Sequence, residues 1–241
     1  MILSDQLGAE GVASGFFLAG AGIMAYAVRG RTSQIFGPSV WRGDARRRSV
    51  AITFDDGPSE STPEFLEVLR EYSAPATFFQ CGTNVRRLTE VARAVHAAGH
   101  EIGNHSDTHP LCCFRPRRFI EDDFARAQDC FSDILGVKPK LLRAPFGVRW
   151  FGYRAMQRKL GLLGVMWTVI GRDWKLPSRA IAARVVTAAR NGAIICLHDG
   201  RNLSERPDVR NSVEALKYIL PALQEQGYQF ETVSQILCPM T

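Results

Sequence analysis

From about residue 48 onward, short apolar runs rich in β-branched residues alternate with stretches whose apolar side chains recur at helical spacing. Ser49–Phe54 and Ala76–Cys81 have the composition of buried strands, and Thr62-Pro63 between them favours the start of a helix. Further strands are expected at His100–Asn104, Lys140–Arg143, Leu163–Val169, Ala193–Leu197 and Gln229–Thr232, and further helices at Leu88–Val95, Arg117–Leu135, Ile181–Ala189 and Val213–Leu223. Such alternation requires parallel strands joined by helical crossovers. The sequence therefore predicts an α/β fold, a layered sheet or a barrel, and 241 residues suit one large domain.

Polar side chains of unusual type stand where the predicted strands end. They are Asp55, Asp56, His105, Arg143, Asp173 and His198. In a barrel of parallel strands, the carboxyl ends of the strands form the active-site face. We therefore expect these groups, which lie far apart in the sequence, to meet at one site.

Asp56, His105 and His109 offer one oxygen and two nitrogens to a divalent cation. Two histidines four residues apart are a weak metal signal alone, but with Asp56 they make a three-ligand set of the type that holds zinc or a similar ion. Three protein ligands leave a coordination position for water and substrate, as in hydrolytic sites. Asp55 is then a spare carboxylate that can take a proton from the water.

Two further groups are interpreted from their neighbours. Arg143 could be solvated, or it could hold Asp55 by a charge-assisted bond. A buried aspartate beside His198 would favour the imidazolium form and make this histidine a proton donor near neutral pH.

The charge and cysteine content restrict the partners. The formal net charge is +6, and arginines cluster within residues 42–48 and 115–118. Such patches either attract a polyanionic surface, such as a membrane or an acidic cell-wall polymer, or are simply solvated. No aromatic stacking pattern accompanies them, so no nucleic-acid partner is expected. The six cysteines include no CxxC pair, which argues against a thiolate zinc site.

The N-terminal segment is interpreted separately, because residues 11–28 carry no charge and are mostly apolar. They are just long enough to span a bilayer, so residues 1–30 are a membrane anchor, a cleaved signal or a helix packed on the domain. The basic residues that follow would keep an anchored domain on the cytoplasmic side. We therefore divide the chain into an apolar segment (1–30), a basic linker (31–47) and a catalytic domain (48–241).

Five ordered segments, TFDDGP, HSDTHP, RAPFG, RDWK and LHDG, resemble the motifs of the polysaccharide deacetylase family with a NodB-type domain, carbohydrate esterase family four. The resemblance covers roughly residues 48–235. It implies a distorted (β/α) barrel of about seven units. It also implies one divalent metal, zinc first, with cobalt, nickel or manganese as alternatives. The substrates implied are N-acetylated amino sugars and, less often, O-acetylated glycans.

The resemblance also implies a chemical role for each motif residue. Asp55 would be the general base, with Arg143 orienting it, and His198, tuned by Asp173, would protonate the leaving amine. The implied metal ligands are Asp56, His105 and His109.

Three residues are expected at the substrate. A backbone N–H near Phe146 would hold the oxyanion, and Trp174 and Leu197 would line the sugar site. Many relatives carry an additional Asp three residues before the Asp-Trp pair, where this chain has Ile170. This departure concerns substrate contacts more than the chemistry.

The sequence thus predicts a hydrolase that removes acetyl groups from N-acetylated sugars of a glycan or cell-envelope polysaccharide. One alternative is a deacylase acting on a lipid-linked sugar or a non-glycan amide at the membrane, reached through residues 11–28. Another is a glycan-binding protein without activity. No obligatory protein partner is implied, and the expected location is the cell envelope, on a side of the membrane that the sequence does not identify.

Overall fold

A computed structural model describes residues 19–238. The chain forms a nine-stranded sheet with the order β1-β6-β5-β4-β3-β2-β8-β7, and β9 adds to it by pairing with β2. The strands are β1 (Ser39–Val40), β2 (Ser49–Asp55), β3 (Ala76–Gln80), β4 (Glu101–Asn104), β5 (Leu141–Leu142), β6 (Leu163–Val165), β7 (Val169–Ile170), β8 (Ala193–His198) and β9 (Gln229–Phe230). The helices are α2 (Thr62–Glu71), α3 (Gly82–Arg87), α4 (Thr89–Ala97), α5 (Arg117–Leu135), α6 (Tyr153–Leu160), α7 (Ser178–Ala188), α8 (Arg210–Glu225) and α9 (Val233–Leu237), with a 3₁₀ turn at Pro145–Gly147.

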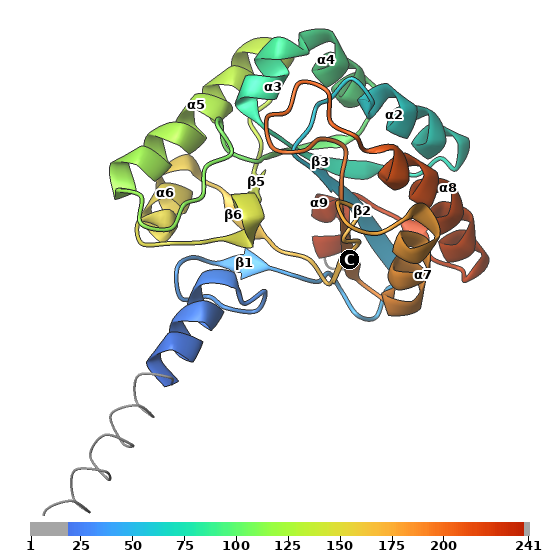
Figure 1. The fold of residues 1–241 in the computed structure, drawn as a ribbon, viewed down its shortest axis with the longest axis horizontal. Helices are drawn as coiled ribbons and strands as arrows, with labels where there is room; N and C mark the ends of the chain where they lie inside the picture. The colour runs from blue at the N-terminus through green and yellow to red at the C-terminus, as the bar shows by residue number, and fades with distance from the viewer. Residues whose placement is uncertain (1–18, 239–241) are drawn as a thin grey trace, which may run out of the picture.

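The parallel strands form a curled sheet, and helices α2 to α5, α7 and α8 lie around its outer side (Figure 1). The edges of this sheet are β1 and β7, which do not pair with each other among the described residues. The fold is therefore a barrel-like parallel sheet that stays open on one side. This confirms the predicted distorted (β/α) barrel.

Strand β2 shows how the sequence builds the two sides of the sheet. Successive side chains of a strand point to opposite faces. Val50, Ile52 and Phe54 belong to the main core under the outer helices, whereas Ala51 belongs to a second cluster inside the curl. By the same alternation, Asp55 points inward, to the side where the site lies.

The stretch predicted as one strand over Leu163–Val169 is divided into β6 and β7, and Met166 to Thr168 lie between them. Hydrogen bonds of Met166 and Thr168 account for the break. Met166 accepts a hydrogen bond from the Arg143 guanidinium, and the Thr168 hydroxyl donates to the Trp41 carbonyl. Across this break the chain changes its pairing partner, because β6 pairs with β1 and β7 pairs with β8.

Residues 31–47, predicted as a linker, pack on the domain instead. Within them, β1 forms an edge of the sheet by pairing with β6, and Arg42 bridges to Ala193. The buried guanidinium of Arg149 donates to the Ser33 carbonyl at 2.7 Å and to the Ser39 hydroxyl at 2.9 Å. This segment is therefore part of the folded unit.

The prediction for residues 11–28 lies largely outside the described residues. Residues 19–29 are helical and project from the β1 side of the molecule (Figure 1). Ala27 and Val28 pack into a core cluster with α5 and α6, while Ile23, Met24 and Tyr26 are exposed. Within residues 19–238, no helix has both the length and the apolar character needed to cross a bilayer.

Candidate active site

The predicted polar residues meet around one cavity of about 360 Å³. Each comes from the carboxyl end of a strand or from the loop that follows it, as the sequence predicted. Loops there can approach one another because all the strands run in the same direction. The residues lining this cavity are Arg29, Asp55, Asp56, His105, His109, Phe146, Gly147, Trp167, Ile170, Trp174, Cys196, His198, Gly200, Arg201 and Asn202.

Asp56, His105 and His109 converge on one point. The Oδ1 atom of Asp56 lies 3.2 Å from Nε2 of His105 and 2.9 Å from Nε2 of His109. Ligands of a tetrahedral zinc ion at bond lengths of ~2.0–2.2 Å stand about 3.4 Å apart, so these donors are close to the required spacing. The three residues are buried and offer N, N and O donors, a set that suits zinc or a similar divalent ion.

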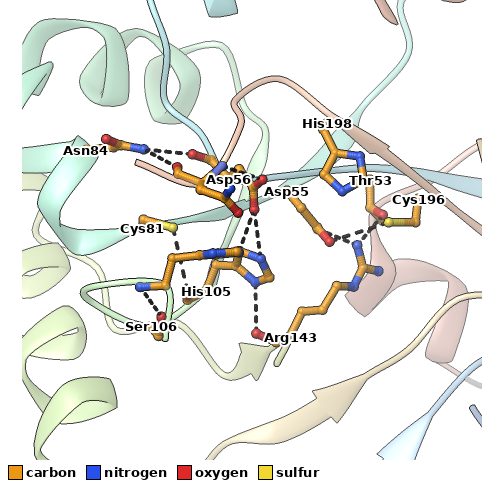
Figure 2. Close-up of polar contacts among 12 residues, drawn as sticks. Thr53, Asp55, Asp56, Cys81, Asn84, His105, Ser106, Arg143, Cys196 and His198 are labelled. Atoms are coloured by element: carbon orange, nitrogen blue, oxygen red, sulfur yellow. Dashed lines mark hydrogen bonds and ion pairs between the residues drawn. The ribbon is translucent and has the colours of Figure 1, made fainter. Parts of the chain in front are cut away.

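The surroundings of this set fix the orientation of its donors. Nδ1 of His105 lies 2.9 Å from the Arg143 carbonyl oxygen, to which it can donate, and this tautomer turns the Nε2 lone pair toward Asp56 (Figure 2). The second oxygen of Asp56 accepts a hydrogen bond from the Asn202 amide at 2.8 Å. Burial would raise the pKa of Asp56, but hydrogen bonds and charge interaction with His105 and His109 hold it well below its usual range. Asp56 is therefore an anion ready to bind a cation.

The backbone at Asp56 is left-handed, with φ of 73°. For a residue other than glycine this costs about 1–3 kcal/mol, so the surrounding structure must hold it. The side chain of Asn84 donates to the Asp56 carbonyl at 2.8 Å. A Cβ at Gly200 would stand 2.4 Å from that carbonyl oxygen, and a Cβ at Gly57 would stand 2.3 Å from Asp199 Oδ2. The close packing around the turn thus requires glycine at both positions.

The loop that carries the two histidines is held by a residue that the sequence did not indicate. Asp123 of α5 is fully buried and accepts hydrogen bonds from the amides of Asp107 and Thr108, at 3.0 and 3.3 Å, and from the Thr108 hydroxyl at 2.8 Å. Arg126 ties Asp123 to Asp107 from the solvent side. The two residues that Asp123 holds, Asp107 and Thr108, lie between His105 and His109 in the sequence.

Asp55 is held by Arg143. The fully buried guanidinium donates to Asp55 Oδ1 at 2.6 Å and to the Thr53 hydroxyl at 2.7 Å. Its face lies over the Phe79 ring, 4.2 Å from the centroid. Of the two alternatives for Arg143 that the residues left open, the structure shows the buried charge-assisted bond.

His198 is paired with Asp173. Nδ1 of His198 lies 2.9 Å from Asp173 Oδ1, and Asp173 Oδ2 accepts from the His198 amide and the Ser212 hydroxyl. Burial alone would lower the pKa of His198, but the charge and hydrogen bond of Asp173 outweigh it and raise this pKa to about 9. The Asp173 carboxylate therefore favours the imidazolium form of His198 at neutral pH.

Comparison with known proteins identifies the family. The sequence profile described as polysaccharide deacetylase matches residues 42–165. The chain belongs to the polysaccharide deacetylase family. A chitooligosaccharide deacetylase of Bradyrhizobium sp. strain ANU 289 is 37% identical over 198 residues, which cover 78% of this chain and 90% of the relative. A peptidoglycan-N-acetylglucosamine deacetylase of Bacillus cereus is 37% identical over 201 residues, covering 82% of this chain and 92% of that protein.

Solved structures agree with the sequence comparison. A peptidoglycan N-acetylglucosamine deacetylase in complex with a naphthalenyl N-oxidanyl-benzamide superposes with a TM-score of 0.76. It is 27% identical and covers 82% of this chain and 91% of that one. These matches confirm the predicted family, fold and enzyme class, a hydrolase of the deacetylase type.

Two of the three residues expected at the substrate line the cavity of this deacetylase. Trp174 is half-exposed and meets His198 edge to face, with ring centroids 5.3 Å apart. Phe146 is half-exposed in a left-handed conformation, with its ring 4.7 Å from that of His109. Both rings thus border the cavity and are open to solvent.

Leu197 differs from the prediction. It is fully buried in the main core and does not belong to the lining of the cavity described above. The reason is strand alternation, because Cys196 and His198 on the same strand point inward and Leu197 points to the helix side. The Leu197 contact with substrate is therefore corrected to a core contact.

Sequence reasoning missed several groups around the site. Trp167 and Cys196 line the cavity, and Arg29 and Arg201 lie on its wall. The position of Cys196 could have been found from the sequence, since it stands two residues before His198 on the same strand and shares its face. The other three lie in loops or on the N-terminal helix, where no periodic pattern fixes the direction of a side chain.

Proposed function

We propose that this protein is a metal-dependent deacetylase that removes acetyl groups from N-acetylated amino sugars of a cell-envelope glycan, releasing acetate. The observation that carries the proposal is the convergence of a three-ligand metal set with an ion-paired carboxylate and a protonated histidine in one cavity. Metal-assisted hydrolysis of an acetamide uses a bound cation, a general base and a proton donor, and this cavity offers a group for each. Family membership and the names of its relatives, which act on chitooligosaccharide and peptidoglycan, support the substrate class.

Asp56, His105 and His109 would hold the metal, for which zinc fits the donors best and cobalt, nickel or manganese remain alternatives. When bound there, a divalent cation supplies polarisation of the acetyl carbonyl and a more acidic water. The spacing of the donors and the histidine tautomer fixed by Arg143 support this assignment.

Asp55 would take the proton of the attacking water as general base. The Arg143 bond holds one of its oxygens by a charge-assisted contact and so fixes the orientation of the carboxylate. His198 would then donate its proton to the leaving nitrogen, so that the amine departs rather than the water. Asp173 would keep His198 charged and oriented. Trp174 and Phe146 would flank the sugar ring, and a backbone amide near Phe146 would help to hold the oxyanion.

The test is acetate release and product mass from N-acetylated chitooligosaccharides and from peptidoglycan fragments, with metal-loaded protein. We expect a mass loss of one acetyl group per event with at least one of these glycans. Asp55→Asn and His198→Ala should each keep the bound metal and lower turnover by ~10²–10⁴-fold. Wild-type turnover in Asp55→Asn would remove the base assignment. Tight sugar binding without any acetate release would favour the inactive glycan-binding alternative.

A second candidate substrate is a lipid-linked sugar deacylated at a membrane. The observation that favours it is the N-terminal helix, whose exposed Ile23, Met24 and Tyr26 lead into Arg29 on the wall of the cavity. This helix would bring a membrane-embedded substrate to the site, with residues 11–28 as the associating segment. Release of acetate from detergent-solubilised lipid-linked N-acetyl sugars, but not from soluble oligomers, would select this candidate. Release from soluble oligomers alone would reject it.

A further inference from the structure

A second group of metal-binding side chains lies beside the first. Asp55 comes from β2, and Cys196 and His198 come from β8. The two strands are neighbours, with Asp55 directly opposite His198 and Thr53 opposite Cys196. Cys196 and His198 are two residues apart on one strand, so both side chains point to the inner face with Asp55. Figure 2 shows the three side chains together next to Asp56.

One ligand atom from each of Asp55, Cys196 and His198 lies within 4.8 Å of the others. The Cys196 thiol is 3.4 Å from Asp55 Oδ2, with Sγ as donor. Zinc–sulfur and zinc–oxygen bonds of ~2.3 and ~2.1 Å at a tetrahedral angle place the two ligand atoms about 3.6 Å apart. The thiol and the carboxylate thus already stand at the separation that a shared metal ion requires.

His198 is oriented as a metal ligand. Its Nδ1 pairs with Asp173 at 2.9 Å, which leaves Nε2 as the ring nitrogen for a metal. Histidines that bind metals commonly donate their other ring N–H to a carboxylate in this way. The Asp173 carboxylate itself accepts a hydrogen bond from the Ser212 hydroxyl at 2.7 Å, so the orientation of His198 does not depend on a bound ion.

We propose that Asp55, Cys196 and His198 form a second metal site, selective for a strongly thiophilic divalent cation such as Cd²⁺, and that its occupation inhibits the enzyme. A thiolate, an imidazole and a carboxylate form a softer ligand set than Asp56, His105 and His109, which contain no sulfur. A thiophilic ion therefore distinguishes the two sites. All three side chains of the second site line the cavity, so an ion can reach them from solvent.

Binding at the second site exchanges protons for the metal. Burial and the charge of Asp55 keep Cys196 in the thiol form. As the Sγ–metal bond forms, the S–H bond breaks and its proton passes to buffer, and a protonated His198 also releases its proton.

Inhibition follows from the roles assigned to Asp55 and His198, so this part of the proposal rests on the proposed function. An ion held by these two groups occupies the base and the proton donor at once. The existence of the site rests on the geometry alone. The two claims can therefore fail separately.

The experiment uses untagged protein loaded with one equivalent of Zn²⁺ and then titrated with Cd²⁺. Bound zinc and cadmium are counted by mass spectrometry after removal of free metal, and sulfur-to-cadmium charge transfer is followed in the near ultraviolet. We expect the wild type to keep its zinc, take up one cadmium ion with a charge-transfer band, and lose acetate release in step with that band. Cys196→Ala and Cys196→Ser should lose the band and bind the second ion more than about 100-fold more weakly, because a direct ligand exceeds a neighbouring group in effect.

Three other cysteines provide matched controls. Cys81 is as buried as Cys196, with Sγ 3.7 Å from the His105 carbonyl oxygen, and Cys113 and Cys238 are more accessible. Cys81→Ala, Cys113→Ala and Cys238→Ala should each keep the cadmium band. Loss of the band in one of these variants, its persistence in Cys196→Ala, or uptake of cadmium only in exchange for zinc would overturn the proposal. A second ion with the expected band in a protein that releases no acetate would retain the site and reject the proposed function.

Discussion

The guanidinium of Arg143 and the carboxylate of Asp55 form a charge-assisted hydrogen bond of 2.6 Å, in which the arginine side chain is fully buried and that of Asp55 is 6% exposed. The remaining donors of Arg143 reach the Thr53 hydroxyl and the carbonyls of Val165 and Met166. One side chain thereby connects β2 with the β6–β7 break. Only a planar, multidentate cation can serve these acceptors together.

Replacing Arg143 should harm both stability and turnover. Arg143→Met leaves the Asp55 carboxylate buried without its partner, which typically costs about 3–5 kcal/mol. Arg143→Lys should also be impaired, because an ammonium cannot match the fork of donors. Denaturant unfolding and acetate release measure the two effects. Arg210→Met, which removes an exposed ion pair, should leave both unchanged. An Arg143→Met variant as stable as the wild type would contradict this account.

Metal removal should abolish activity and lower the thermal stability. A ligand that binds only the folded state stabilises it by about 2.7 kcal/mol at a concentration 100 times its Kd. Dialysis against a chelator should therefore lower the Tm, and Zn²⁺ should restore both Tm and turnover. His105→Ala should lose the metal, while His96→Ala, an exposed histidine on α4, should keep it. Metal content by mass spectrometry checks this, and equal content in both variants would disprove the ligand assignment.

The Asp173–His198 pair makes a prediction about pH. A proton donor must carry its proton, so turnover should fall as the pH rises toward the raised pKa of about 9. A bound divalent cation offsets the negative charge of Asp56, so the alkaline limb of the loaded enzyme lies at or below this value. In Asp173→Asn the main charge that raises the pKa is gone, and the limb should move to lower pH. The pH profile of kcat measures this shift.

The same pair should affect the pH dependence of stability. The pKa of His198 is higher in the folded protein than the usual value of 6.5, so its stabilising contribution is complete below pH 6.5 and is lost as the pH approaches about 9. Unfolding free energies of wild type and Asp173→Asn should therefore converge between these values. Asp129→Asn, at an exposed position of α5, is the control and should shift neither profile. A parallel course of the wild-type and Asp173→Asn curves would contradict the assignment.

Asp123 should control metal affinity without touching the metal. Asp123→Ala leaves the amides of Asp107 and Thr108 without their acceptor, so the loop between the histidines loses its support. Groups that orient metal ligands typically contribute 10–100-fold in affinity or activity, and we expect a loss of about that size. Asp122→Ala, the exposed neighbour on the same helix, should bind zinc like the wild type. Competition with a zinc chelator measures the affinity, and equal values for both variants would exclude this role.

Much of the architecture was predictable because the spacing of apolar residues in the sequence indicates both the type of element and its buried face. The helix at Arg117–Leu135 was predicted with the same bounds, since its apolar residues recur on one face and Gly136 ends it in a left-handed conformation. The meeting of Asp56 with His105 and His109 followed from their positions after parallel strands. In both cases a local pattern and a general rule of parallel sheets sufficed.

The remaining features depend on contacts that are distant in the sequence. The break between β6 and β7 arises from hydrogen bonds with Arg143 and Trp41, and nothing local marks it. The folding of residues 31–47 onto the sheet edge depends on Arg149, more than a hundred residues away. Leu197 was misplaced for another reason. The motif suggested a contact with the substrate, but strand alternation turns this side chain into the core. The roles of the site residues in catalysis stay predictions until the variants are measured.

The pairing of β2 with β8 determines when the site can form during synthesis of the chain. The strand that ends in Asp55 is synthesised well before its neighbour, which ends in His198. Asp55 and His198, the proposed base and proton donor, can therefore come together only after β8 has left the ribosome. A polypeptide that ends before β8 would lack this pairing.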